Sequence, residues 1–261
     1  MKYKFDEAKH RHYIADAEGK FKMVPGVTTI SGMIDDGKSG ALMGWAAKMV
    51  WEKFVDEYIA PNGPAWPMVH LWELCPENFS EIGSYLKKNY KVSRDASADL
   101  GTRVHSHCET YWDDLTEERI VLPDEYPAWT AFQMWVGKYN PYPIENEMSV
   151  YSEKFRYAGI LDLLAEIDGK TYLVDLKTSN RVSGGMFIQV AGYAIAYEEM
   201  TGKSIENAGI LRLDKLTGIY EWTDLSDDLA QAKEDFMGCL NLYQNLKSYR
   251  KTIRGGIYKG E

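Results

Sequence analysis

The sequence is poor in cysteine. Its 261 residues include only three cysteines, Cys75, Cys108 and Cys239, and these are far apart in the chain. So few cysteines exclude a disulfide scaffold and are typical of proteins from a reducing compartment. A metal centre held by four cysteines is excluded as well, so we expect no iron–sulfur cluster.

Long apolar runs are also missing. The sequence has no stretch of about 18 consecutive apolar residues, so it predicts no membrane-spanning helix. The residues from Met1 to Asp6 lack the apolar segment of a secretory signal peptide. We therefore expect a cytoplasmic protein that does not associate with membranes.

Basic residues are outnumbered by acidic ones. The chain has 30 lysines and arginines against 39 aspartates and glutamates, a net charge of −9. This charge argues against a protein that coats nucleic acid through electrostatic attraction. It is compatible with an enzyme that gathers carboxylates around a metal ion and contacts DNA locally. The remaining composition, 45% hydrophobic and 26% charged, is typical of a globular protein.

The two halves of the chain differ in pattern. Residues 10–30 are typical of a β-hairpin, and helical spacing follows at about 40–59, 77–91, 95–115 and 123–139. Strand patterns then predominate, at about 147–155, 157–167, 170–177, 206–213 and 218–223, with helices at about 184–201 and from about 226 to 249. We expect an α+β fold: a mixed β-sheet flanked by helices over residues 95–261, continuous with a hairpin and mainly helical region over residues 1–94.

The most informative segment is a predicted hairpin around Asp168-Gly169, a residue pair that favours a tight turn between two strands. A two-residue turn pairs Ile167 with Lys170. The same register places Asp162 directly opposite Asp175, with Cβ atoms about 5 Å apart. The sequence therefore predicts two carboxylates side by side in an otherwise apolar hairpin.

Two opposed carboxylates conflict with their surroundings. Like charges directly opposite each other destabilise a sheet, and an unpaired charge among apolar residues is costly. A divalent cation between them would remove the conflict, and oxygen ligands suit Mg²⁺ or Mn²⁺. In the alternative interpretation, one aspartate faces solvent in a salt bridge with Lys177, which lies on the same face as Asp175. A register slip of one residue would separate the two aspartates.

Four motifs follow one another in a recognisable order. They are a helix with His105, the segment Gly159-Ile160-Leu161-Asp162, the segment Asp175-Leu176-Lys177, and a glutamine and tyrosine four residues apart at Gln189 and Tyr193. This order resembles the PD-(D/E)XK nuclease superfamily, in its RecB-like branch of phage-type and CRISPR-associated exonucleases. The region from Val27 to Trp45 is more weakly similar to the mitochondrial genome-maintenance exonuclease. The second acid is an aspartate, where the superfamily often has glutamate, and the cysteine quartet of some relatives is absent.

The resemblance implies a set of metal ligands. Asp162, Asp175 and the backbone carbonyl of Leu176 would hold Mg²⁺ or Mn²⁺, with His105 as a further ligand. Glu109 lies four residues after His105 on the same helix face, and Glu147 precedes the hairpin, so each is a candidate for an additional ligand. An HxHxDH-type zinc site is disfavoured because the chain has only five histidines.

The resemblance also implies catalytic and DNA-binding residues. Lys177 would orient or activate the attacking water and offset charge on the phosphorus. Gln189 and Tyr193 share one helix face and would act in catalysis or hold DNA phosphates. Three arginines are candidates for contacts with DNA phosphates: Arg103, Arg156 and Arg181.

The leading hypothesis is a metal-dependent DNA exonuclease with a restriction-endonuclease-like core and a helical N-terminal region over its site. The resemblance implies hydrolysis of phosphodiester bonds from single- or double-stranded DNA ends. It places this activity in DNA recombination, repair or degradation in a bacterial or phage-infected cell. A single-strand-annealing protein or a second copy of the chain is a candidate partner. Two alternatives stay open: an endonuclease with the same site, and a catalytically inactive DNA-binding module.

Overall fold

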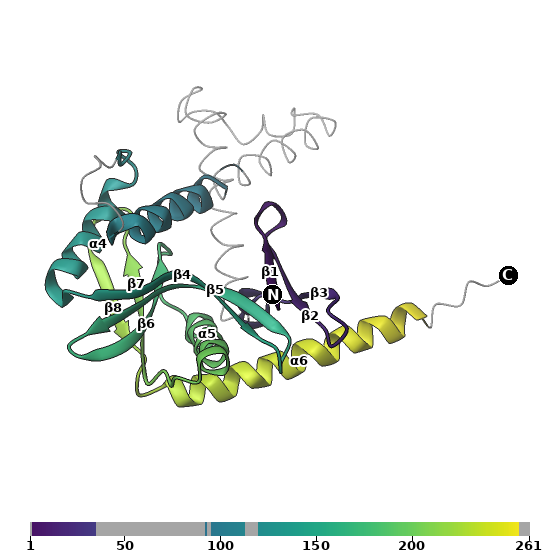
Figure 1. Cartoon of the computed structure of the whole chain (residues 1–261). Coiled ribbons are helices and arrows are strands. Elements are labelled where there is room, and N and C mark those ends of the chain that lie inside the picture. Colours follow the sequence, from purple (N-terminus) through teal and green to yellow (C-terminus); the bar gives the residue numbers. More distant parts are fainter. Residues whose placement is uncertain (1, 35–91, 93–94, 113–119, 256–261) are drawn as a thin grey trace, which may run out of the picture. The chain divides into compact units, whose positions relative to one another are not determined.

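A computed structural model of the chain describes residues 2–34, 92, 95–112 and 120–255, with side chains up to residue 249 (Figure 1). The chain divides into two compact units, one formed by Met1–Ile34 with Arg103–Glu261 and the other by Asp35–Thr102. The helices expected at about 40–59 and 77–91 lie outside the described residues. In this division residues 1–34 share a unit with the core, and a boundary at residue 94 stays a prediction.

The N-terminal residues form a small antiparallel sheet. Its strands β1 (Tyr3–Asp6), β2 (Arg11–Ala15) and β3 (Phe21–Val24) pair in chain order, and the helix α1 (Val27–Ser31) follows. The hairpin expected within residues 10–30 is confirmed. Its turn is stable because Gly19 adopts a φ of 78° and Asp16 Oδ1 accepts two backbone N–H groups. The sequence pattern does not predict β1.

The main sheet has five strands in the order β4-β5-β6-β7-β8. Strands β6 and β7 run parallel, and the other neighbours are antiparallel. A parallel pair needs a long crossover, and the helix α5 supplies it. The expected α+β fold with a mixed sheet is therefore confirmed. The strands are β4 (Tyr142–Ser152), β5 (Tyr157–Ile167), β6 (Lys170–Lys177), β7 (Asn207–Leu213) and β8 (Tyr220–Asp224).

The hairpin of β5 and β6 has the predicted register. Ile167 pairs with Lys170, and the ladder continues to Leu163 and Val174. The two residues of the turn, Asp168-Gly169, adopt φ values of 51° and 74°. These left-handed values are those that a type I′ turn requires, and an Asp-Gly pair adopts them readily. Local turn chemistry thus fixes the centre of the sheet.

Helices cover both faces of the main sheet (Figure 1). The helix α4 (Tyr126–Tyr139) lies against β7 and β8, where the rings of Trp135 and Trp222 are 5.7 Å apart. On the other face, α5 (Gly184–Thr201) lies between the sheet and α6 (Leu229–Gly255). Close packing of these two helices requires Gly192, because a Cβ there would stand 2.4 Å from the ring of Phe236.

The helices agree with the sequence pattern except at their ends. The helix α5 has the expected bounds, whereas α4 begins at Tyr126 and α6 continues to Gly255. Residues 95–109 are helical and lead into a 3-10 helix, η5 (Thr110–Trp112). Within the described residues, no helix combines the length and apolar character needed to cross a bilayer.

Hydrogen bonds join the small sheet to the start of β5. Arg156 donates to the carbonyl oxygens of Ile14 and Ala15 at 2.9 and 2.8 Å. The N–H of Ala158 donates to the carbonyl oxygen of Pro25 at 3.1 Å. The Arg156 guanidinium thus attaches the small sheet to the core, and its contact with DNA stays a prediction.

Candidate active site

Three neighbouring strands bring acidic side chains together: Glu147 on β4, Asp162 on β5 and Asp175 on β6. The β5–β6 ladder ends one pair short of the two aspartates. The Asp162 carboxylate instead accepts the backbone N–H of Leu176 at 2.6 Å. The register agrees with the predicted placement of the two aspartates, but their direct pairing lies one step beyond the hydrogen-bonded ladder.

Glu147 has an uncommon backbone conformation. Its φ of 45° lies in the left-handed region, which residues other than glycine rarely adopt. Its neighbours Asn146 and Met148 pair with β5, whereas Glu147 does not. Strain of this kind is concentrated at functional sites, and here it occurs in a residue whose carboxylate lies close to His105 and Asp162.

Among the described residues, His105, Glu147 and Asp162 form a group suited to a metal ion. One ligand atom from each lies within 4.8 Å of the others, and His105 Nδ1 is 3.6 Å from Asp162 Oδ1. An octahedral Mg²⁺ holds its ligands at about 2.1 Å, which places opposite ligands about 4.2 Å apart. Two carboxylates and an imidazole at this spacing fit such an ion, or Mn²⁺, after small adjustments.

Asp175 and Lys177 form a buried ion pair beside this group. The Asp175 side chain is 1% exposed, and its Oδ2 lies 2.5 Å from Lys177 Nζ. The ammonium also donates to the carbonyl oxygen of Leu176 at 3.3 Å, which is the predicted backbone ligand. Apart from this ion pair, Asp175 Oδ2 has no hydrogen-bond partner among the described residues. The alternative interpretation of the sequence therefore holds in part: the salt bridge exists, but it is buried.

The helix α5 brings Gln189 and Tyr193 to the same place. Gln189 Nε2 donates to Asp175 Oδ1 at 3.3 Å and contacts the Tyr193 hydroxyl at 2.9 Å. The two residues are four apart and so stand one above the other on the helix. Gln189 thus holds one oxygen of the Asp175 carboxylate, whereas Lys177 holds the other. A contact of either residue with DNA stays a prediction.

Glu147 and Asp162 have opposite pKa shifts. Burial, and then repulsion from Asp162 and Glu109, raises the pKa of Glu147 to about 7. Burial would also raise the pKa of Asp162, but the hydrogen bond and charge of His105 outweigh it, and this pKa lies below its usual value. At neutral pH Asp162 is an anion, and a cation would relieve the repulsion that favours a proton on Glu147.

Lys177 stays charged in these surroundings. Burial alone would lower the pKa of Lys177, but Asp175 and Asp162 raise it above the usual value. Burial raises the pKa of Asp175 to about 6, against the attraction of Lys177. A lysine that keeps its proton acts as a cation and a hydrogen-bond donor rather than as a general base.

Glu109 lines the same small pocket as His105, Glu147 and Asp162. Its backbone carbonyl accepts a hydrogen bond from Asn146 Nδ2 at 3.3 Å. Its carboxylate is not part of the three-residue group. Of the two additional ligands that the sequence suggests, the geometry therefore favours Glu147.

Arg103 lies outside the cluster, in a network that sequence reasoning missed. It pairs with Asp124 at 2.7 Å and with the buried carboxylate of Glu125, which also contacts His107. Burial would raise the pKa of Glu125, but hydrogen bonds from the Leu122 N–H, Arg103 and His107 lower it to about 2. Nothing in the local sequence marks Glu125 as buried. The network gives Arg103 a structural role, and its contact with DNA stays a prediction.

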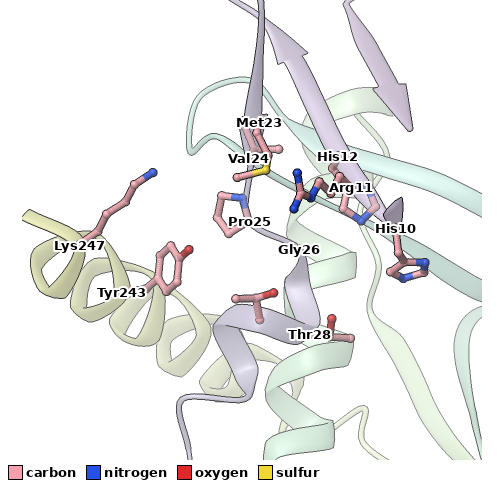
Figure 2. Close-up of a pocket in the computed structure, with 11 residues that line it drawn as sticks. His10, Arg11, His12, Met23, Val24, Pro25, Gly26, Thr28, Tyr243 and Lys247 are labelled. Atoms are coloured by element: carbon pink, nitrogen blue, oxygen red, sulfur yellow. The ribbon is translucent and has the colours of Figure 1, made fainter. Parts of the chain in front are cut away.

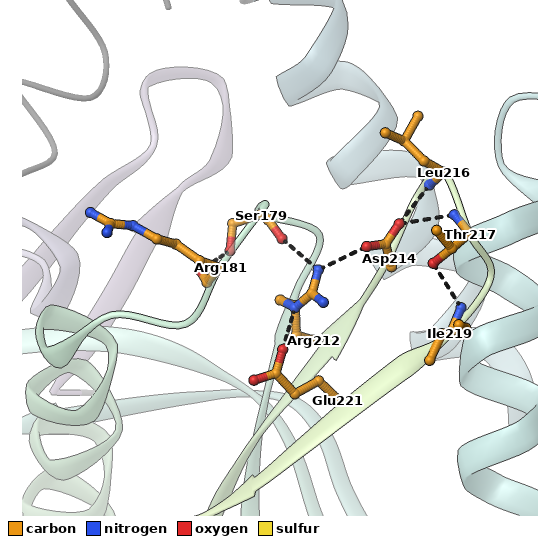
Figure 3. A network of polar contacts seen from close by, with 8 residues as sticks. All are labelled: Ser179, Arg181, Arg212, Asp214, Leu216, Thr217, Ile219 and Glu221. Atoms are coloured by element: carbon orange, nitrogen blue, oxygen red, sulfur yellow. Dashed lines mark hydrogen bonds and ion pairs between the residues drawn. The ribbon is translucent and has the colours of Figure 1, made fainter. Parts of the chain in front are cut away.

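Arg181 lies in the loop that follows β6 (Figure 3). Arg212 fixes this loop: it donates to the Ser179 carbonyl at 3.5 Å, to Asp214 at 3.1 Å and to Glu221 at 2.7 Å. The Ser179 hydroxyl donates to the Arg181 carbonyl at 2.9 Å. The Arg181 side chain extends away from Arg212 in Figure 3. Its contact with DNA stays a prediction.

Gly159 makes room for Tyr193, and replacing it tests this contact. A Cβ on Gly159 would stand 2.6 Å from the Tyr193 ring and 3.1 Å from Val27. We expect Gly159→Ala to lower the free energy of unfolding by about 1–3 kcal/mol through overpacking, measured by urea unfolding. Gly137→Ala is the control, because nothing lies within 4 Å of its Cβ. Equal stabilities of the two variants would contradict the contact.

Strands β4, β5 and β6 and the helix over residues 95–109 thus bring carboxylates, a lysine and a histidine together, a set of groups suited to holding a divalent metal ion. The chain is 28% identical over 142 residues to the CRISPR-associated exonuclease Cas4 of Francisella tularensis subsp. novicida (strain U112), covering 48% of this chain and 72% of that protein. A solved structure from Eubacterium rectale, provisionally described as an exonuclease, has 13% identity and a TM-score of 0.40, over 60% of this chain and 69% of that one. No protein-family model matches the chain. The sequence similarity supports a place for the chain among the nucleases.

Proposed function

We propose that the chain is a divalent-metal-dependent nuclease that hydrolyses DNA phosphodiester bonds from strand ends. The observation that carries the proposal is the group of His105, Glu147 and Asp162 next to the buried pair of Asp175 and Lys177. The similarity to a protein named an exonuclease supports a nuclease activity in general. The motif order supports the RecB-like branch of the PD-(D/E)XK superfamily, and hence the preference for strand ends.

The proposed metal ligands are His105, Glu147 and Asp162, with Asp175 and the Leu176 carbonyl as the resemblance implies. Bound Mg²⁺ or Mn²⁺ would supply polarisation of the scissile phosphate and a water of lowered pKa. Asp162 is the best anchor for the ion, because its pKa is low and the Leu176 N–H fixes one of its oxygens. No iron–sulfur cluster is part of the proposal.

Lys177 contributes a positive charge at the reacting phosphate. Its ammonium is held by Asp175, whose other oxygen is held by Gln189, and Gln189 in turn contacts Tyr193. This chain of contacts fixes the ammonium before substrate arrives. A preorganised cation stabilises the negative charge that develops on the phosphate oxygens and donates to the attacking water.

The complete set of Asp162, Asp175 and Lys177 favours catalysis over a DNA-binding module that has lost activity. An endonuclease with the same site is the second candidate for the reaction. The proposed setting is DNA recombination, repair or degradation in a phage or a bacterium. DNA ends are the proposed substrate, with a single-strand-annealing protein or a second copy of the chain as a proposed partner.

A cleavage assay with three DNA forms tests the proposal. Linear single-stranded, linear double-stranded and covalently closed circular DNA are incubated with Mg²⁺, with Mn²⁺ and with EDTA. We expect loss of linear DNA only, in either metal and not in EDTA. Cutting of closed circles would establish the endonuclease instead, and binding without cutting would establish the binding module.

A further inference from the structure

A second cavity lies between the small sheet, α1 and α6 (Figure 2). Its volume is about 260 Å³. Pockets for drug-sized ligands usually measure about 300–1,000 Å³, so this cavity suits a smaller group. Arg11 and His12 on β2 lie on one side of it, and Tyr243 and Lys247 on α6 lie on the other.

The lining of this cavity is basic, in contrast to the chain as a whole. It includes His10, Arg11, His12 and Lys247, and none of the described residues that line it is acidic. The chain overall has a net charge of −9. Within the part of the chain that the structure describes, the Arg11 and Lys247 side chains make no hydrogen bond or ion pair. Two cations thus face one small space without a counter-ion from the described chain.

Neutral hydrogen-bond donors complete the lining. Thr28, Thr29 and Tyr243, each of which carries a hydroxyl group, line the same space. His12 is buried, and its Nδ1 lies 2.8 Å from the Tyr3 hydroxyl. Burial, and then the charge of His10, lowers the pKa of His12 to about 4, so it contributes a neutral ring. The charge of the cavity therefore comes mainly from Arg11 and Lys247.

This combination of groups selects an oxyanion. Two long cationic side chains on opposite sides, with hydroxyl groups and no carboxylate, match a phosphate with several charged oxygens. The site is also connected to the carboxylate cluster through β5. Gly26, at the edge of the cavity, forms a bridge with Ala158. Asp162 lies four residues after Ala158 on β5, a distance of about 13 Å at a rise of about 3.3 Å per residue.

We propose that this cavity binds a phosphate group of a nucleic-acid strand whose cleavage site lies at the carboxylate cluster. The choice of nucleic acid as the source of the phosphate rests on the proposed function. One strand of B-form DNA advances about 3.4 Å per phosphate along the helix axis. The cavity would therefore hold the strand within a few nucleotides of the reacting bond and fix its path over the sheet.

The test measures the affinity for a labelled single-stranded oligonucleotide in EDTA at several salt concentrations. We expect Arg11→Gln and Lys247→Gln each to weaken binding about threefold to tenfold. Each should also reduce the slope of log affinity against log salt by about 0.7, the value for one phosphate contact on a single strand. Lys4→Gln and Lys203→Gln remove equally exposed charges away from the cavity and should change neither quantity.

Unchanged affinity and slope in the Arg11→Gln/Lys247→Gln double variant would overturn the proposal, as would an equal loss in the control variants. A thermal shift by inorganic phosphate that the double variant abolishes, with unchanged DNA affinity, would overturn the assignment to nucleic acid. The measurement is independent of cleavage. DNA binding through the cavity without cutting would refute only the proposed function, and cutting with unchanged binding would refute only this inference.

Discussion

Lys177→Ala is expected to reduce DNA cleavage by about 100-fold to 1,000-fold, a loss of about 3–4 kcal/mol of transition-state stabilisation. Asp175 holds the Lys177 ammonium beside the proposed metal ligands, with a distance of 2.5 Å between Nζ and Oδ2. Removing it leaves the developing charge on the phosphate without this partner. The measurement is the initial rate of loss of a linear substrate in Mn²⁺.

A matched set of variants separates catalysis from folding. Lys177→Ala leaves the Asp175 carboxylate buried without its counter-charge, and breaking a buried pair costs about 3–5 kcal/mol of stability. Lys177→Arg keeps the charge and the pair, but its planar group cannot reproduce the compact ammonium, so we expect a folded protein with a reduced rate. Lys170→Ala, on the exposed end of the same strand, should cleave normally. A folded Lys177→Ala variant with the wild-type rate would contradict the proposed role.

The second large effect concerns metal binding without substrate. Saturating Mn²⁺ at about 100 times its dissociation constant should stabilise the wild-type protein by about 2.7 kcal/mol. For a chain of this size, that corresponds to an increase in Tm of about 5–10 °C. We expect Asp162→Asn to lose this shift, because the substitution removes the anion that lies within 4.8 Å of both His105 and Glu147.

The asparagine variant is preferred to alanine for a structural reason. Its side-chain oxygen can still accept the Leu176 N–H, so the end of the hairpin is preserved. Asp227→Asn, which removes an exposed carboxylate elsewhere, should keep the full shift. The same increase in Tm for Asp162→Asn and the wild-type protein would show that the metal binds elsewhere.

The centre of the fold follows from local sequence chemistry. The Asp168-Gly169 turn fixes the register of β5 and β6, and the observed pairing of Ile167 with Lys170 agrees with it. That register brings Asp162 and Asp175 to neighbouring strands without any long-range information. The four-residue spacing of Gln189 and Tyr193 likewise predicts their shared helix face, and the structure shows their contact.

The rest of the site depends on tertiary contacts that no local pattern encodes. Glu147 joins His105 and Asp162 through a left-handed backbone conformation that a glutamate does not signal. Arg103 pairs with Glu125, a buried residue directly before the helix α4. The basic cavity combines residues near the two ends of the chain, such as Arg11 and Lys247, and sequence spacing cannot relate them.

The most direct test of the account compares wild-type protein with Asp162→Asn on linear DNA, each in Mg²⁺, in Mn²⁺ and in EDTA. We expect cleavage by the wild-type protein only when a divalent metal is present, and a loss of at least about 100-fold in the variant. Cleavage by the wild-type protein in EDTA, or equal rates for the two proteins in metal, would contradict the claim that this carboxylate cluster carries a metal-dependent reaction.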